Sequence, residues 1–219
     1  MTDIRCVLAG MTRLLSPPLL LLFWHKRTRA RLYPALIAFG VCFPVFIIGA
    51  AIRSGFSHSN FVSYYLGQAV LYGILEEGAK YLVLRFLLDS YDSRKDAVTY
   101  AIGHGAYEEF AAGLTCLGLI GTNRAAAGIF WFSLWAAING AAFVIANTVL
   151  IFYGINTDRA KIMLPAAILL HAAANASQGI LFEPAAIAFQ TLLTAGACFA
   201  AYRCYQAMQS PYEDESFDP

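Results

Sequence analysis

Residues 128–153 have the sequence GIFWFSLWAAINGAAFVIANTVLIFY, which contains no Asp, Glu, Lys or Arg. A helix of about 20 apolar residues is long enough to cross the roughly 30 Å hydrocarbon core of a bilayer. The segment is therefore predicted to be a transmembrane helix. The composition of the chain agrees, since 59% of its 219 residues are hydrophobic and only 13% are charged, against about 25% charged residues in a soluble domain.

Six further apolar segments flank this run, and together they predict an all-α, polytopic membrane bundle of seven helices. The first segment contains Arg13 and Pro17, and it ends in a basic run without a small-residue cleavage site. We therefore expect a retained, kinked span and not a cleaved signal peptide. The predicted spans cover about residues 5–24, 33–52, 61–88, 96–120, 128–153, 162–182 and 185–206.

The charges between the spans predict the orientation of the bundle. Four basic residues follow the first span within residues 26–31, and every second connection after it is also basic. Positive residues in short loops stay on the cytoplasmic side, which places the N-terminus outside and the C-terminus in the cytoplasm. The basic residues on the predicted cytoplasmic side are Lys26, Arg27, Arg29, Arg31, Arg94, Lys95, Arg159, Lys161 and Arg203.

The rest of the composition narrows the possible classes of protein. A net charge of +1 gives no indication of nucleic-acid binding, and five cysteines without a CxxC pair indicate no disulfide framework. Residues 1–209 are predicted to form a single membrane-embedded domain. Residues 210–219 are acidic and are predicted to be a disordered tail.

The first polar motif inside a span is Glu76-Glu77-Gly-Ala-Lys80. A charged side chain at membrane depth costs on the order of 3 kcal/mol, so such residues need a structural or functional reason. Glu76 and Lys80 are four apart and share a helix face, while Glu77 points about 100° away. One glutamate can therefore face a cavity while the other pairs with Lys80 or a neighbouring helix. The alternative is a Glu–Lys pair that only joins helices.

Two more motifs place histidines inside spans, each with a polar residue four positions later. His104 precedes Glu108 in the fourth span and lies between two glycines, which leave its ring approachable. His171 precedes Asn175 in the sixth span across three alanines. Each histidine alone could be a core residue that forms a hydrogen bond across the bundle. Together, the three motifs supply carboxylate, imidazole and amide groups from three helices at similar depth, so we expect them to converge.

These motifs resemble those of the YhfC-type membrane peptidases and, more distantly, of the PrsW and CAAX prenyl-protein endopeptidase families. Glu76-Glu77-x-x-Lys80 is similar to their first motif, Tyr100-x-x-x-His104 to the second, and His171-x-x-x-Asn175 to the third. Gly-His104-Gly with Glu108 is more specifically similar to YhfC. The resemblance covers residues from about 14 to 206.

The resemblance implies a glutamic-type intramembrane endopeptidase, without a catalytic metal or other cofactor, in a prokaryotic cell membrane. Glu76 would activate water with the help of His104, and His171 with Asn175 would stabilise the oxyanion. Glu77, Lys80 and Glu108 would support these groups.

A protein or peptide associated with the bilayer would be the substrate, and a polar cavity would open towards the cytoplasm. The CAAX enzymes carry an arginine five positions after the first glutamate, where this chain has Tyr81. This departure favours the YhfC and PrsW types and argues against prenylated substrates.

Three alternatives to this hypothesis stay open from the sequence. Glu76, His104 and His171 could bind Zn²⁺ with one open position, as in a metal-dependent peptidase, although no HExxH motif occurs. Intramembrane Glu and His residues also form the proton relays of transporters and channels. A non-enzymatic scaffold could keep the motifs without the chemistry.

Overall fold

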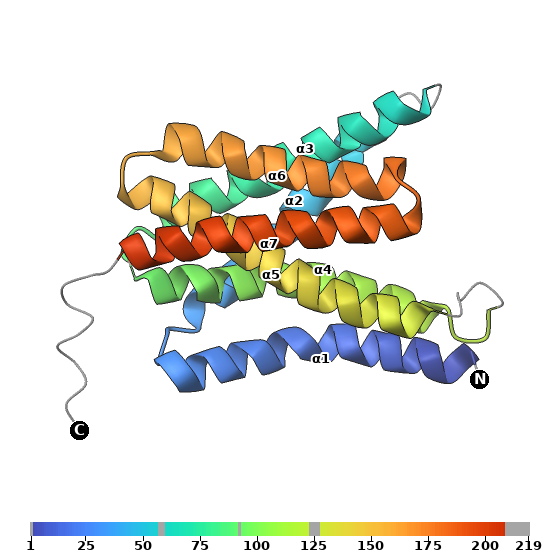
Figure 1. Cartoon of the computed structure of the whole chain (residues 1–219). Helices are drawn as coiled ribbons and strands as arrows, with labels where there is room; N and C mark the ends of the chain where they lie inside the picture. Colours follow the sequence, from blue (N-terminus) through green and yellow to red (C-terminus); the bar gives the residue numbers. More distant parts are fainter. Residues whose placement is uncertain (1, 57–59, 92, 123–127, 209–219) are drawn as a thin grey trace.

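The computed structural model of the chain describes residues 2–56, 60–91, 93–122 and 128–208 (Figure 1). In these residues it contains seven α-helices and no β-strand, which confirms the predicted all-α fold. A π-helical turn, Val83–Leu87, follows the third helix. The α-helices are α1 (Thr2–Thr28), α2 (Tyr33–Arg53), α3 (Phe61–Leu82), α4 (Arg94–Gly118), α5 (Ile129–Asn156), α6 (Ala160–Ile180) and α7 (Glu183–Ala207). The predicted acidic tail lies outside the described residues.

Five of the helices, α1, α2, α5, α6 and α7, are long and apolar enough to cross a membrane. The other two, α3 and α4, are the helices that carry most of the charged residues predicted to form the site. With 22 and 25 residues they are about 33 and 38 Å long at 1.5 Å per residue, which also suffices to cross the hydrocarbon core. The chain is therefore a polytopic helical membrane protein, as predicted.

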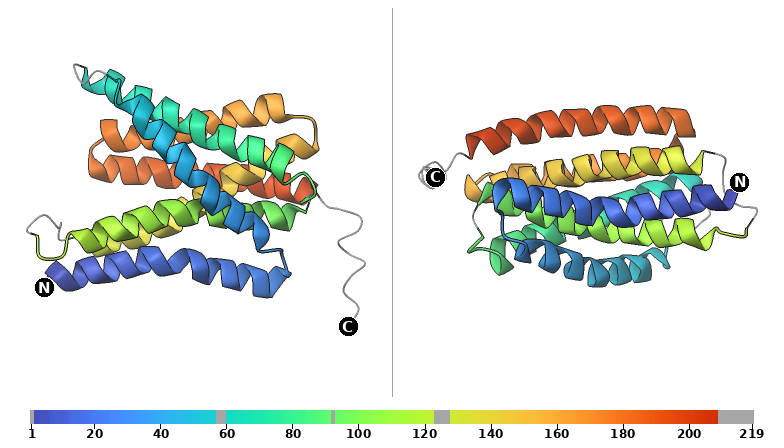
Figure 2. Two further views of the ribbon diagram at one scale, coloured as in Figure 1. Left: turned by 180° about the vertical axis from the view of Figure 1, so that it is seen from behind. Right: turned by 90° about the horizontal axis from the view of Figure 1, so that it is seen from below.

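The arrangement of the helices puts α4 in the middle of the bundle. It packs against α1, α2 and α5, while α3 packs along α6 and α7 packs along α5. Figure 1 shows α1 along one side of the bundle and α3 with α6 along the other. Figure 2 shows α2 crossing α4 obliquely. Side chains from the middle of α3, α4 and α6 can thus point into one region.

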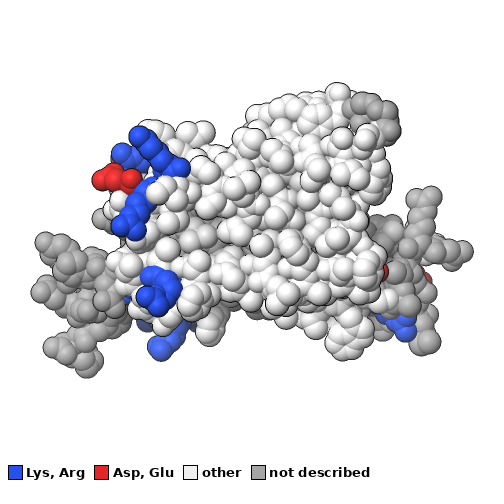
Figure 3. Space-filling view, turned by 45° about the horizontal axis from the view of Figure 1, so that its top comes forward, with Lys and Arg blue, Asp and Glu red and all other residues white. Residues whose placement is uncertain are grey.

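The two ends of the bundle differ in charge. Lys and Arg gather at the end where α1 connects to α2, where α5 connects to α6 and where α7 finishes, and the flank between the ends is uncharged in the view of Figure 3. We call this the basic end. The opposite end contains the C-terminus of α2, the N-terminus of α3 and the C-terminus of α6 (Figure 1). By the loop-charge rule, the basic end is the predicted cytoplasmic side.

An ion pair between α1 and α4 explains the charge inside the first predicted span. Arg13 donates a hydrogen bond to Glu109 with an Nη1–Oε1 distance of 2.6 Å, and both side chains are largely buried. The pair compensates two charges that would each be costly at this depth. It also holds α1 against the helix that carries His104. The sequence singled out Arg13 only as a departure from a signal peptide and did not predict its partner.

Gly103 lies where α2 crosses α4, directly before His104. A methyl group at this position would overlap the backbone of Ala35 in α2. Gly105, on the other side of His104, differs because a methyl group there would lie 3.8 Å from Val144, which is an ordinary contact. The two glycines were predicted to leave the His104 ring approachable. Gly103 instead permits close packing of two helices, as small residues often do in membranes.

We expect Gly103→Ala to destabilise the protein by about 1–3 kcal/mol, the usual cost of inserting a methyl group into packed structure. Thermal unfolding of the purified protein in detergent measures this effect. Gly105→Ala is the matched control, because it adds the same methyl group two residues away, where the methyl makes only an ordinary contact with Val144. Equal unfolding temperatures for the two variants would contradict a tight α2–α4 crossing.

Candidate active site

Glu77 and Lys80 form a buried ion pair on α3. The Lys80 Nζ donates a hydrogen bond of 2.8 Å to Glu77 Oε1, and neither side chain is more than 1% exposed. The pairing partner of Lys80 is thus the glutamate three positions before it, although Glu76 shares its face at four positions. Glu76 is left free to point towards α4 and α6. This division of the two glutamates is one of the arrangements that the sequence allowed.

Glu77 also fixes the orientation of His171 on α6. The Nδ1 of His171 lies 2.6 Å from Glu77 Oε1. Since an ionised carboxylate only accepts hydrogen bonds, Nδ1 is the donor. In the neutral ring, the other nitrogen, Nε2, then carries a lone pair, and it lies 3.7 Å from Glu76 Oε2. A carboxylate that orients a histidine through its second nitrogen is common around metal-binding imidazoles.

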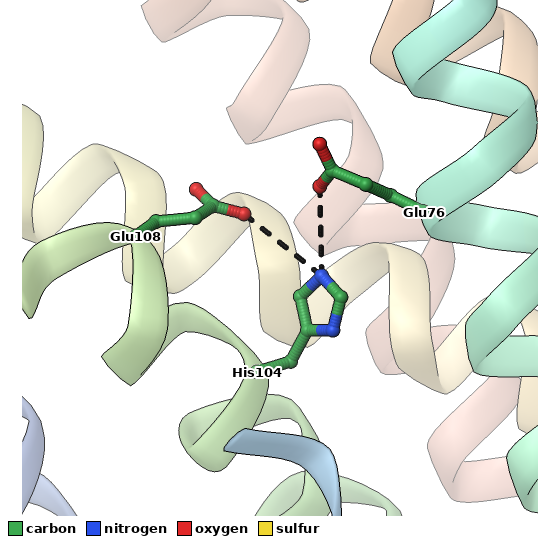
Figure 4. Close-up of side chains that lie close together, drawn as sticks. All are labelled: Glu76, His104 and Glu108. Atoms are coloured by element: carbon green, nitrogen blue, oxygen red, sulfur yellow. Dashed lines mark ion pairs between the residues drawn. The ribbon is translucent and has the colours of Figure 1, made fainter. Parts of the chain in front are cut away.

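His104 on α4 brings a second imidazole to the same carboxylate. Its Nε2 lies 3.5 Å from Glu76 Oε2 and 3.9 Å from Glu108 Oε1 (Figure 4). The other ring nitrogen, Nδ1, lies 3.3 Å from the Cys42 sulfur, and that thiol donates to the His104 carbonyl. In the tautomer with the proton on Nδ1, the sulfur accepts a hydrogen bond from the ring, and Nε2 is an acceptor that faces the two carboxylates.

Glu76, His104 and Glu108 each offer one atom that could bind a metal, and together these three ligand atoms fit a divalent cation. One atom from each residue lies within 4.8 Å of the others. Glu76 Oε2 and His104 Nε2 are buried, and among the described residues neither has a hydrogen-bond partner. Three acceptor atoms that face one another repel unless a cation or a proton lies between them. Imidazole and carboxylate ligands suit Zn²⁺ and similar ions.

A cavity of about 510 Å³ lies beside this cluster, between α2, α3, α4 and α6. Glu76, Glu108, His171 and Asn175 all contribute to its lining. The Glu108 side chain is 36% exposed, whereas Glu76 is 6% exposed and His104 is 1% exposed. Glu108 is thus the member of the cluster most accessible to water, and His104 lies behind Glu76.

The structure brings together the residues that the sequence singled out. The Nε2 atoms of His104 and His171 each lie within 4 Å of the same Glu76 oxygen, and Asn175 lines the cavity beside them. Glu77 contacts His171 and Lys80 contacts Glu77, and neither is among the described residues that line the cavity. Glu108 was predicted to have a supporting role, but it faces the cavity directly. Cys42, which contacts His104, was not anticipated, because nothing in the sequence distinguishes it from the other free cysteines.

The direction of the cavity differs from the sequence-based expectation. Its lining extends from Glu76 to Arg53, Gln68 and Gln178, which lie at the opposite end of the bundle and not at the basic end. The sequence predicted an opening towards the cytoplasm. That prediction was based on the depth of Glu76 along α3. The distance from a residue to either end of its helix does not reveal where neighbouring helices separate.

Comparison with protein families gives one match, which covers just under half of the chain. The model of the family described as YhfC intramembrane metalloprotease matches residues 17–121. The resemblance to the YhfC type is confirmed. The segment matched to YhfC contains the first two motifs, with Glu76, Glu77, Lys80, His104 and Glu108. The third motif lies outside it, so the assignment of His171 and Asn175 to the site depends on their positions in the fold. The comparisons with curated proteins and with solved structures found no match.

The description of the YhfC family also concerns whether such enzymes depend on a metal ion. The motifs were predicted to imply a metal-free, glutamic-type enzyme, whereas the family is described as a metalloprotease. The three converging acceptor atoms of Glu76, His104 and Glu108 fit a divalent cation by their chemistry. The family description and the three ligand atoms are therefore both compatible with a bound divalent cation.

Proposed function

We propose that the chain is an intramembrane peptidase that hydrolyses a peptide bond of a membrane-associated protein or peptide. The observation that carries this proposal is the convergence of Glu76, His104 and Glu108 beside a cavity inside a membrane bundle. Hydrolysis in the bilayer needs water, a group that activates it and a site that excludes other water. The cavity, the carboxylate cluster and the surrounding helices would supply these three requirements.

Glu76, His104 and Glu108 would hold a divalent cation, and Zn²⁺ suits these ligands. When bound, such an ion supplies Lewis-acid polarisation of water and of a carbonyl oxygen. Three protein ligands leave a position open, as in catalytic zinc sites. Glu108, the most exposed of the three, has a second carboxylate oxygen, which would take up the proton released by the attacking water.

His171 and Asn175 would act on the substrate from the α6 side of the cavity. Glu77 holds His171 by a short hydrogen bond, and Lys80 in turn holds Glu77. A ring held in this way is oriented before the substrate arrives and needs no reorganisation during the reaction. The Asn175 amide can donate a hydrogen bond to a developing oxyanion. In its doubly protonated form His171 would also donate from Nε2. Together with Asn175 it would then stabilise negative charge on the scissile carbonyl.

A metal-free, glutamic-type reaction is the second candidate, and a specific observation favours it. Two imidazole Nε2 atoms flank the same Glu76 oxygen, at 3.5 Å and 3.7 Å. Glu76 could therefore act as a general base whose proton passes to His104. We favour the metal-dependent form for two reasons. The chain matches a family described as metalloproteases, and Glu76 Oε2 and His104 Nε2 are buried without a hydrogen-bond partner among the described residues.

Metal content and chelation distinguish these two forms. We expect the purified protein to contain close to one divalent ion per chain, and His104→Ala to remove most of it. A chelator should lower hydrolysis of a membrane-anchored test peptide by at least about a hundredfold, and added Zn²⁺ should restore it, if water is activated at the ion. His25→Ala is the control for loss of a histidine, since His25 lies at the basic end and bonds to the Ala30 carbonyl. Activity that survives chelation in metal-free protein would establish the glutamic type instead.

A further inference from the structure

The cavity beside the cluster has opposite charges at its two ends. Its inner part is lined by the carboxylates of Glu76 and Glu108. Arg53 lies at the far end of the lining and is the only lysine or arginine among the described lining residues. A peptide in this cavity would meet a cation near the mouth and carboxylates at the bottom. Such polarity can fix the direction in which a segment enters.

The mouth of the cavity offers groups that recognise a carboxylate. Arg53 is the last residue of α2, and its side chain is exposed. A guanidinium group donates several hydrogen bonds in a geometry that matches a carboxylate. Gln68 and Gln178, which also line the cavity, can donate further hydrogen bonds through their amides.

The aromatic side chains between the mouth and the cluster suit an extended peptide. Phe46, Tyr65 and Tyr72 contribute to the same lining. Gln68 and Glu76 are eight positions apart on α3, which corresponds to about 12 Å along the helix axis. An extended peptide covers this distance with three or four residues at 3.3–3.6 Å each. A carboxylate at the mouth would therefore belong to a residue three or four positions from the scissile bond.

The mouth lies at the end of the bundle that is opposite to the basic end. Arg53 terminates α2, Gln68 is the eighth residue of α3, and Gln178 lies in the last turn of α6. All three positions belong to the opposite end (Figure 1). By the loop-charge rule, that end faces away from the cytoplasm.

We infer that the peptide substrate enters the cavity from the end opposite the basic end, with a carboxylate of the substrate bound by Arg53. This inference rests on the proposed peptidase function and specifies its substrate as a segment with an acidic group outside the cytoplasm. Arg53 is then a specificity-determining residue.

Binding to an inactive chain tests the recognition without the need for hydrolysis. The probes are pairs of apolar, C-terminally amidated peptides that differ only in carrying Asp or Asn at one position. The protein is the Glu76→Gln variant in detergent. We expect the Asp peptide to bind about fivefold more tightly, within the range of exposed charge pairs. Arg53→Gln in the same background should remove the preference, and Arg53→Glu should reverse it in favour of a Lys peptide.

Arg203→Gln is the matched control for the binding measurement, because Arg203 is an exposed arginine near the C-terminus of α7, at the basic end. It should leave the preference unchanged. A free-acid form of the Asn peptide shows whether a terminal carboxylate serves as well as a side chain. Equal binding of the Asp, Asn and free-acid peptides would overturn the inference. If the Asp peptide binds selectively but the wild-type protein never cleaves it, the recognition by Arg53 stands and the proposed peptidase function is contradicted.

Cysteine labelling tests the side of entry. Gln178→Cys places a thiol at the mouth and Lys161→Cys places one at the basic end, and a membrane-impermeant maleimide is applied to sealed vesicles of either orientation. We expect the two variants to be labelled from opposite sides, in excess of the parent chain. The Asp peptide should protect only Gln178→Cys. Labelling of both variants from the same side would overturn the inferred direction of entry.

Discussion

Replacement of Glu76 by Gln is expected to lower kcat/KM for a membrane-anchored test peptide by at least about a hundredfold. Glu76 would be a cation ligand in the metal-dependent form and the general base in the metal-free form. Glu76 is the group that both forms of the proposed reaction share. Its Oε2 is the atom common to the short distances from His104 and His171. Gln keeps the shape of the side chain but removes the charge, so it neither activates water nor binds a cation well. Hydrolysis by purified wild-type and variant protein in detergent provides the measurement.

Two controls make the loss of activity interpretable. The unfolding temperature of Glu76→Gln should stay close to that of the wild type, since Lys80 keeps its partner Glu77. Replacing Glu183, the first residue of α7 at the opposite end, by Gln makes the same chemical change outside the cluster and should leave activity unchanged. Undiminished cleavage by Glu76→Gln would contradict the role of Glu76. Solute uptake that survives this change, in a chain that never hydrolyses peptides, would favour the transporter alternative.

Replacement of Lys80 by Met is expected to destabilise the protein by about 3–5 kcal/mol, the usual cost of removing one partner from a buried ion pair. The Lys80 side chain is fully enclosed and its ammonium group compensates the charge of Glu77. Met fills a similar volume without the charge, so the unpaired carboxylate accounts for the loss. Unfolding in detergent, followed by loss of helical signal, measures the change.

A double variant separates the charge from the packing. Addition of Glu77→Gln to Lys80→Met removes the unpaired charge, and an amide oxygen can still accept from His171. We expect this double variant to recover a substantial part of the lost stability. Lys161→Met is the matched control, since Lys161 is exposed at the basic end and surface changes alter stability by about 0.5 kcal/mol or less. Equal losses for Lys80→Met and Lys161→Met would show that the buried pair contributes little.

Much of the fold follows from the linear pattern of apolar segments. Residues 128–153 are apolar throughout, and the helix Ile129–Asn156 forms there, because a segment without charges in a bilayer must satisfy its backbone hydrogen bonds internally. The third predicted span, 61–88, agrees with α3 and the π-helical turn that continues it to Leu87, but the change of helix type at Val83 was not predicted. A local change of helix type changes no hydropathy and leaves no trace in the sequence.

The candidate site was predictable in its members but not in its pairings. Glu76, His104, His171 and Asn175 stood out because polar groups inside spans are costly. Two of the pairings involve residues far apart in the sequence. Glu109 pairs with Arg13, and Glu77 bonds to His171. Spacing within one helix says nothing about which side chain of another helix will face it.

The sequence by itself determined that the chain is a helical membrane protein with a costly polar cluster, because both properties depend on the order of apolar and charged residues along the chain. Only the tertiary structure decided how that cluster is organised. In the folded chain Lys80 pairs with Glu77, and Glu108 lines the cavity. The cavity extends from Glu76 to Arg53. The physical reason is that these features depend on the rotation and crossing of helices around one another. The crossing at Gly103 and Ala35 fixes one of these relationships through contacts between segments far apart in the sequence.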